Sequence, residues 1–203
     1  MAVDDLAYSD VRALRIPWRR ILVGVGVAVG LVGGGFVTTN TYSLLWQRHL
    51  EGQWATVLAS GTASTSAMGD PVAKIIIPDL GLERVVVEGV GGSALRKGPG
   101  HLPGSSLPGE LGNSVVRGHR LLWSGPFRNL DRLDYGSRIL VQTQGGTAVY
   151  LVAGVFQLDE DRTDFYEDTV LPYLTLVTSD PPFRANRMLV IRAVMVERNG
   201  EPI

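Results

Sequence analysis

Few side chains in this sequence could carry out chemistry, because it contains no cysteine and only three histidines, His49, His101 and His119. The lack of cysteine excludes disulfides, thiolate metal sites and thiol nucleophiles. A hydroxyl is not ionised by a nearby cation as a thiol is, so a hydroxyl nucleophile needs a base within hydrogen-bond reach and a third group that orients this base. The histidines lie far apart in the sequence, and we therefore expect neither a transition-metal site nor a cofactor.

The signatures of other common enzyme classes are missing from the sequence. It has no Gly-x-Ser-x-Gly elbow, Ser-x-x-Lys pair, His-Glu-x-x-His zinc helix, phosphate-binding Gly-x-x-x-x-Gly-Lys loop or EF-hand. The net charge of -1 and the pI near 6.3 give no basic field that would indicate nucleic acid as a partner. A length of 203 residues suffices for one domain with accessory segments.

The elements that would position reactive side chains are short β-rich runs, which follow one another from Lys74 onward. Turn-forming segments rich in glycine and proline separate these runs and indicate a small antiparallel or mixed β-barrel. No repeat of fixed period is visible, which argues against a propeller or a solenoid. The predicted strands are 74–77, 84–88, 113–117, 138–142, 148–158, 173–178 and 188–197.

An apolar N-terminal segment predicts a membrane anchor. The run from Ile21 to Val37 is uncharged, and with the flanking Trp18 and Tyr42 it is long enough as a helix to cross a bilayer. An arginine excess before the run places the N-terminus in the cytoplasm and the rest of the chain outside. A cleaved signal peptide is the alternative, but no Ala-x-Ala site follows at the usual distance.

Glycines recur every fourth residue within this segment, at Gly26, Gly30 and Gly34. This spacing places them on one face of a helix, where a second transmembrane helix could pack closely. The alternative is that a glycine-rich apolar segment, which also contains Gly24 and Gly33, produces the spacing by chance.

Between the anchor and the β-rich region we expect a short amphipathic helix followed by a flexible linker. Trp46, Leu50, Trp54 and Val57 have helical spacing and predict an apolar stripe at the membrane surface or against the domain. The linker, residues 60–71, consists largely of small and polar residues. The predicted organisation is a cytoplasmic segment (1–20), an anchor (21–43), a stalk helix with linker (44–72) and a β-barrel domain (73–203).

A series of short motifs lies in order between Ala73 and Val196, and two of them carry reactive side chains. In order and spacing this series resembles the sortase family, with the class E, actinobacterial-type branch as the closest pattern. The resemblance implies an eight-stranded sortase β-barrel with short helices, outside a Gram-positive-type membrane. The motifs are Ile77-Pro78-Asp79-Leu80-Gly81-Leu82, Val87-Glu88-Gly89, Lys97-Gly98-Pro99-Gly100-His101-Leu102-Pro103-Gly104, Leu107-Pro108-Gly109, Asn113-Ser114-Val115-Val116-Arg117-Gly118-His119-Arg120, Phe127-Arg128-Asn129-Leu130-Asp131 and Leu174-Thr175-Leu176-Val177-Thr178-Ser179-Asp180-Pro181-Pro182.

By this resemblance the candidate catalytic residues are His119, Ser179 and Arg187. In the family a cysteine thiolate attacks a sorting signal such as Leu-Pro-x-Thr-Gly, and an amine resolves the thioacyl enzyme. The histidine transfers protons and the arginine stabilises the oxyanion. In this sequence Ser179 stands where the family has cysteine.

The neighbours of these residues receive structural interpretations. Asp180 is expected to cap the turn before Pro181, because strand alternation points it away from a histidine that Ser179 could reach. Arg192 lies five residues after Arg187 and therefore on the opposite strand face. His101, in a loop rich in glycine and proline, is interpreted as a rim residue.

Two classes of function remain. The first is an acyl-transfer enzyme, with Ser179 as nucleophile or as a serine introduced in place of cysteine to trap a transpeptidase. The second is a sortase-fold pseudoenzyme that binds a sorting-signal peptide or a membrane-protein partner. The sequence favours the second, because a hydroxyl without an oriented base is a poor nucleophile.

Overall fold

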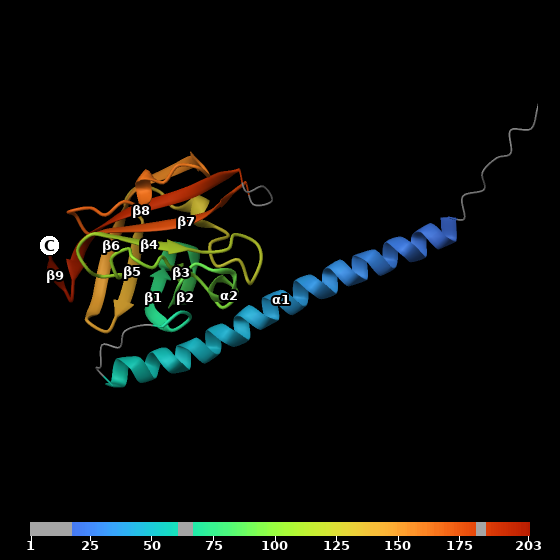
Figure 1. Cartoon of the computed structure of the whole chain (residues 1–203), viewed down its shortest axis with the longest axis horizontal. Helices are drawn as coiled ribbons and strands as arrows, with labels where there is room; N and C mark the ends of the chain where they lie inside the picture. The colour runs from blue at the N-terminus through green and yellow to red at the C-terminus, as the bar shows by residue number, and fades with distance from the viewer. Residues whose placement is uncertain (1–17, 61–66, 182–185) are drawn as a thin grey trace, which may run out of the picture. The chain divides into compact units, whose positions relative to one another are not determined.

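A computed structural model describes residues 18–60, 67–181 and 186–203 of the chain, and these divide into two compact units with the boundary between Gly35 and Phe36. One long helix, α1 (Trp18–Ser60), precedes a closed sheet of short strands (Figure 1). The strands are β1 (Pro71–Ile77), β2 (Leu82–Glu88), β3 (Gly100–His101), β4 (Asn113–Arg117), β5 (Arg138–Thr143), β6 (Gly146–Asp159), β7 (Tyr173–Asp180), β8 (Arg187–Arg198) and β9 (Glu201–Pro202). Short helices lie between them: η1 (Pro78–Leu80), α2 (Gly92–Leu95), η2 (Leu130–Arg132) and η3 (Asp164–Tyr166).

Eight of these strands close into a mixed β-barrel, which confirms the predicted fold class. The order is β6-β5-β1-β2-β3-β4-β7-β8, and pairing of β6 with β8 closes the ring, while the two-residue β9 adds to β8 outside it. The β2–β3 and β4–β7 pairs are parallel, and the other pairs are antiparallel. All seven predicted strands are present within a few residues of their expected bounds, whereas β3 and β9 were not predicted because each spans only two residues.

Alternating apolar residues fill the barrel. In β1 the inward positions are Ala73, Ile75 and Ile77, all fully buried, as the two-residue period of a strand requires. The connection from β4 to β5 adds Phe127 and Leu130 to the same core. This connection follows His119 in sequence, so burial of its apolar residues also restrains the chain around the candidate site.

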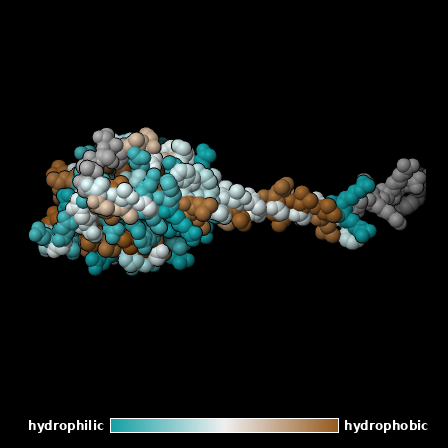
Figure 2. Space-filling view, turned by 90° about the horizontal axis from the view of Figure 1, so that it is seen from below, coloured by the Kyte–Doolittle hydropathy of each residue, from teal (hydrophilic) through white to brown (hydrophobic). Residues whose placement is uncertain are grey.

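The apolar anchor and the stalk predicted from the sequence are parts of one continuous helix, α1. Its first half is long and apolar enough to cross a membrane by length and composition, and none of this window is buried. Figure 2 shows hydrophobic surface along this stretch of helix. Residues 1–17, with most of the predicted cytoplasmic segment, lie outside the described residues, as do residues 61–66 of the predicted linker.

The later part of α1 packs against the barrel on one helix face. Its buried residues are Ser43, Gln47, Leu50 and Trp54, and Leu50 and Trp54 join an apolar cluster with residues of β2 and α2. The predicted apolar stripe therefore faces the domain at Leu50 and Trp54, whereas Trp46 is only half-buried. Two polar side chains complete the buried face, and their contacts could not be read from hydrophobic spacing.

Gln47 binds backbone groups at an edge of β2 that no strand covers. Its Nε2 donates to the carbonyl oxygens of Val85 (3.1 Å) and Lys97 (2.9 Å), and the Val85 N–H donates to Gln47 Oε1 at 3.0 Å. Gly98 permits this approach, because a Cβ atom there would collide with Gln47 Nε2. The amide thus takes the place of a neighbouring strand at this position of the barrel wall.

Replacement of Gln47 by alanine is expected to destabilise the full chain by about 2 kcal/mol, because the N–H and C=O of Val85 would lose their partner in a buried site. The measurement is chemical unfolding of the full chain in detergent. Gln53→Ala, at an exposed position of the same helix, is the matched control and should change stability by less than about 0.5 kcal/mol. Equal effects of the two variants would mean that Gln47 does not hold the helix on β2.

Candidate functional site

The parallel pairing of β4 with β7 places side by side the strands that lead to His119 and Ser179. Arg117 pairs with Val177, and the Gly118 N–H donates to the Val177 carbonyl at 3.0 Å. The Thr178 hydroxyl then donates to the Gly118 carbonyl at 2.8 Å. His119 and Ser179 each lie two residues beyond the last ladder pair, so the register predicts that they are neighbours.

Both side chains are half-buried at the ends of their strands. Ser179 pairs with Met188 of β8, on the outer barrel face that carries the apolar cluster of Val115, Val177 and Met188. The structure records no hydrogen bond between the His119 ring and the Ser179 hydroxyl among the residues it describes. The geometry supplies proximity without a formed nucleophile–base pair.

The electrostatic surroundings of His119 hold its pKa below the ordinary value of 6.5, first because the ring is partly buried and second because Arg117 lies near. The imidazole is therefore neutral at pH 7 and can accept a proton. Its charged neighbour is a cation, and within the described part of the chain no carboxylate hydrogen-bonds to the ring. A Ser-His-acid arrangement of the usual kind is thus not formed around His119.

Arg187 enters the region from the β7–β8 hairpin. It is exposed, and it pairs with Asp180, whereas Ser179 pairs with Met188. Because neighbouring residues of a strand point to opposite faces, the Arg187 side chain leaves the strand on the Asp180 face. No hydrogen bond or ion pair of Arg187 with Ser179 or His119 is recorded for the described residues, so its oxyanion role stays a prediction.

Arg192 lies on the other face of β8, as the alternation predicted. It pairs with Thr175 of β7, and its guanidinium carbon lies 4.4 Å from the centroid of the Tyr173 ring, a cation–π contact. This position is five residues into the strand and away from the Ser179 end of β7.

A buried arginine, Arg120, joins the two halves of the candidate site. Its Nη1 donates to Asp180 Oδ1 at 2.5 Å and to the Ser179 carbonyl at 3.2 Å, while Nη2 lies 3.3 Å from Asp131 Oδ1. The expected capping of the turn before Pro181 concerns residues 182–185, which lie outside the described residues, so it stays a prediction, and the partner that the structure records for Asp180 is Arg120. The carboxylate is buried and bound to Arg120.

Sequence reasoning missed this pair, although one signal was present. Arg120 and Asp180 each follow a candidate residue by one position and carry opposite charges. In two strands that run parallel and in register, such positions become neighbours. The charge pattern therefore predicts the pair only in combination with the β4–β7 pairing, which hydrophobic periodicity does not specify.

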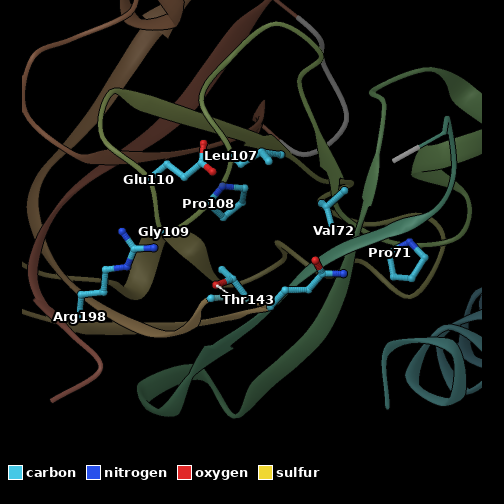
Figure 3. A pocket seen from close by; sticks show the side chains of 10 residues that line it. Pro71, Val72, Leu107, Pro108, Gly109, Glu110, Thr143 and Arg198 are labelled. Carbon is cyan, nitrogen blue, oxygen red and sulfur yellow. Dashed lines mark hydrogen bonds between the residues drawn. The ribbon is translucent and has the colours of Figure 1, made fainter. Parts of the chain in front are cut away.

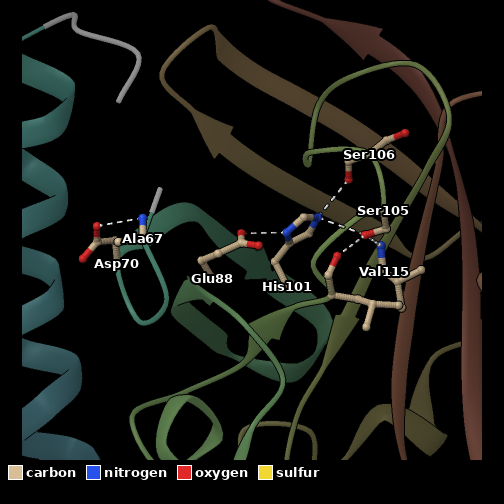
Figure 4. A network of polar contacts seen from close by, with 8 residues as sticks. Ala67, Asp70, Glu88, His101, Ser105, Ser106 and Val115 are labelled. Carbon is tan, nitrogen blue, oxygen red and sulfur yellow. Dashed lines mark hydrogen bonds and ion pairs between the residues drawn. The ribbon is translucent and has the colours of Figure 1, made fainter. Parts of the chain in front are cut away.

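His101 is also placed differently from the expectation. It is 2% exposed, in β3, and is not a rim residue. Its Nδ1 lies 2.8 Å from Glu88 Oε2, and its Nε2 lies 3.0 Å from the Ser106 carbonyl and 3.0 Å from Ser105 Oγ (Figure 4). The ring thereby ties β2 and β3 to the loop that leads toward β4.

The Ser105-His101-Glu88 arrangement has the distances of a Ser-His-acid triad, but its hydrogen bonds do not suit nucleophilic chemistry. The Ser105 hydroxyl donates its only proton to the Leu102 carbonyl at 2.8 Å and accepts the Val115 N–H at 3.2 Å. It therefore has no proton to pass to the histidine. The network is a structural one, which holds the middle of β4 in place at Val115 (Figure 4).

A pocket of about 210 Å³ lies at the other end of the strands (Figure 3). It is lined by residues before β4, in the β5–β6 turn and at the end of β8, including Glu110, Thr143 and Arg198. His119, Ser179 and Arg187 instead lie at the end of β4, the end of β7 and the start of β8. The pocket is thus separate from the candidate site. No group of three or more histidine or acidic side chains that could hold a metal ion occurs within the described ranges.

Comparison with known proteins agrees with this architecture. The Sortase domain family matches residues 75–196. The chain is similar to Sortase SrtE1 of Streptomyces coelicolor, with 26% identity over 84% of this chain, and it spans 58% of the length of that protein. It is 29% identical to Sortase D of Bacillus subtilis over 68% of this chain and 76% of that protein.

Solved structures show the same fold. Sortase E from Streptomyces avermitilis superposes with a TM-score of 0.57 and 28% identity, covering 64% of this chain and 91% of that one. A Clostridium perfringens Sortase D5 transpeptidase superposes with a TM-score of 0.63 at 22% identity, covering 79% of this chain and 99% of that one. With the family match covering more than half of its length, the chain belongs to the sortase family, and it does so without any cysteine.

Proposed function

We propose that this chain is a membrane-anchored, extracytoplasmic sortase-like protein of the class E branch, whose site binds a peptide or membrane-protein partner without efficient covalent catalysis. The similarity to two class E relatives, at 26% and 28% identity, supports the branch. The apolar first half of α1 supports anchoring, with the N-terminus in the cytoplasm.

The proposal of weak catalysis rests on the charged neighbour of His119, which is Arg117. A serine hydroxyl requires a base that a third group, usually a carboxylate, holds in orientation. His119 has Arg117 as its charged neighbour, and the nearest acid in sequence to Ser179, Asp180, is bound by Arg120. This cationic setting suits a thiolate and not a hydroxyl.

The surroundings of Ser179 also suit peptide binding. On the same outer face the described chain has an apolar cluster against which Leu102, Leu158 and Tyr166 pack while only partly buried. Such a surface can take the leucine and proline side chains of a sorting signal. A carboxylate or carbonyl of the peptide would meet Arg117, which follows Val115 by two positions and shares this face, whereas Arg187 leaves β8 on the opposite face.

A second candidate function is slow acyl transfer with Ser179 as nucleophile, and one observation favours it. Because the pKa of His119 is lowered, its imidazole is neutral at pH 7 and is available as a base. Incubation of the full chain with sorting-signal peptides and an amine, followed by mass spectrometry, separates the two functions. An acyl-enzyme on Ser179 or a ligated product would establish catalysis, and saturable peptide binding without either product supports the proposed one.

Arg120→Gln is expected to destabilise the chain by about 3 kcal/mol, because it leaves the buried Asp180 carboxylate without its partner. The measurement is again chemical unfolding of the full chain. Asp180→Asn in the Arg120→Gln background should recover part of the loss, since it removes the unpaired charge. Arg128→Gln, at an exposed position of the same connection, is the control. A loss no larger than that of the control would show that the pair does not stabilise the site.

Ser179→Cys should create a thiol that reacts with iodoacetamide at pH 7 about tenfold faster than free cysteine. The expected cause is a thiol pKa lowered by about one unit in a cationic setting. The rate should fall in the Ser179→Cys background when Arg117 is replaced by glutamine. Ser93→Cys, at an exposed position, should react like free cysteine. If Ser179→Cys is accessible but no faster than this control, the cleft no longer supports a sortase-type thiolate.

Gly30→Ile is expected to weaken crosslinking of the chain to itself or to a membrane partner in intact membranes, because the added side chain would cover the face formed by Gly26, Gly30 and Gly34. An added Cβ at Gly26 or Gly30 meets no atom within 4 Å in this structure, so the change does not disturb α1 itself. Val32→Ile, on the opposite face of the same helix, is the control. Unchanged crosslinking in Gly30→Ile would leave the spacing without a packing role.

A further inference from the structure

A left-handed turn follows the candidate histidine. Trp123, Ser124 and Gly125 have φ angles of 54°, 64° and 49° in succession. Residues other than glycine rarely have a positive φ angle, and for a bulky residue such as tryptophan it is unusual. Several strained residues in succession require surrounding contacts that fix their backbone conformation. Backbone strain of this type is found more often at functional sites than elsewhere.

Three contacts from α1 hold this turn, and the Arg96 guanidinium carbon also lies 5.7 Å from the centroid of the Trp123 ring. Asn40 Oδ1 accepts the Ser124 N–H at 2.6 Å, and Ser43 Oγ lies 3.2 Å from Ser124 Oγ. The Tyr42 ring meets the Trp123 ring edge-on, with centroids 5.7 Å apart. Ser43 is fully buried. These helix residues belong to the same compact unit as the barrel.

The Asn40 amide is itself fixed in orientation. Its Nδ2 donates to the Phe36 carbonyl one turn earlier at 2.7 Å, which directs Oδ1 toward Ser124. The neighbouring Thr39 hydroxyl also donates to the Phe36 carbonyl, at 3.0 Å, but within the described part of the chain Thr39 has no recorded hydrogen bond to the turn. Asn40 and Thr39 thus share the bond to Phe36, and of the two only Asn40 has a recorded hydrogen bond to the turn, a difference that substitutions can test.

The turn is connected rigidly to His119. The Gly125 N–H donates to the Leu122 carbonyl at 2.9 Å, and a Cβ atom on Gly125 would lie 2.6 Å from the Arg120 carbonyl oxygen. The Phe127 N–H donates to the His119 carbonyl at 3.1 Å, and Phe127 is buried in the barrel core. The segment 119–127 is therefore closed at its ends and held by α1 at its tip.

We propose that the part of α1 that follows the apolar run is a positioning element of the candidate site, in which Asn40 and Ser43 hold the Trp123–Ser124 turn and thereby fix the loop that carries His119. This inference rests on the proposed function for the importance of His119, and it adds an element outside the matched sortase domain, residues 75–196. Asn40 lies three residues after Val37, the end of the apolar run. The same helix that anchors the chain would thus set the geometry of the site.

Three variants of the full chain in lipid nanodiscs test this inference. Asn40→Ala removes the acceptor for the Ser124 N–H, Asn40→Asp keeps an acceptor oxygen there, and Thr39→Ala removes only the local bond to Phe36. Hydrogen–deuterium exchange of segment 119–128 should become about tenfold faster in Asn40→Ala, as expected for the loss of one stabilising hydrogen bond. Thr39→Ala should stay within about twofold of the parent, and Asn40→Asp, which keeps the acceptor but loses the Nδ2 bond to the Phe36 carbonyl, should exchange more slowly than Asn40→Ala.

A second readout reports on His119 itself in the native Ser179 protein. Diethyl pyrocarbonate modifies neutral imidazole. The rate of His119 modification, followed by mass spectrometry as a function of pH, therefore gives the midpoint of the His119 titration. The parent midpoint should lie below 6.5, because burial lowers the pKa of His119. In Asn40→Ala the midpoint should rise toward 6.5, since a loosened loop admits water to the ring. The midpoint in Asn40→Asp should stay at the parent value.

Two results would overturn the inference. One is exchange in Asn40→Ala no faster than in Thr39→Ala, which would show that the contact does not hold the turn. The other is a loosened turn with an unchanged His119 midpoint, which would show that the helix does not reach the site. Neither readout depends on the reactivity of residue 179. Failure of the Ser179→Cys variant to form a reactive thiol would therefore count against the proposed function and leave this inference to be decided by its own data.

Discussion

The buried pair of Arg120 and Asp180 is the interaction on which the candidate site depends. It connects the segment after β4 to the end of β7, and the same guanidinium binds the Ser179 carbonyl. Both groups are charged and largely removed from water, so neither can leave without exposing the other as an unpaired charge. The distance between the His119 and Ser179 backbones is therefore set by residues that take no part in the proposed chemistry.

The same pair explains why the site suits a thiol better than a hydroxyl. With its carboxylate occupied by Arg120, Asp180 cannot orient His119, and the charge that acts on the imidazole comes from Arg117. A cationic neighbourhood promotes ionisation of a thiol, whereas a hydroxyl gains little from it. In the function that we propose, the barrel surrounds the Ser179 hydroxyl with a cationic environment from which a hydroxyl gains little.

The helix α1 extends this architecture beyond the barrel. Gln47 pairs with the free edge of β2, and Asn40 and Ser43 meet the turn after His119. Gln47 and Asn40 bind backbone groups that would otherwise lack this partner, whereas Ser43 meets the Ser124 hydroxyl. The part of α1 that follows the apolar run is thus connected to the candidate site by contacts within the unit that begins at Phe36.

The sequence by itself determined the strands, the apolar run and the absence of a thiol. Strand alternation such as Ala73, Ile75 and Ile77 is local, and cysteine content is a matter of counting, so neither needs the fold. Resemblance in motif order also identified the barrel, and it predicted the neighbourhood of His119 and Ser179. Only the tertiary structure decided the partners of polar residues, because these lie far apart in sequence: Arg120 and Asp180 are separated by 60 positions, and Asn40 and Ser124 by 84. Local periodicity indicates that a side chain is buried, but the partner that binds a buried polar side chain depends on strand pairing and helix docking. For this reason the partners of His101, Asp180 and Asn40 are defined only in the folded chain.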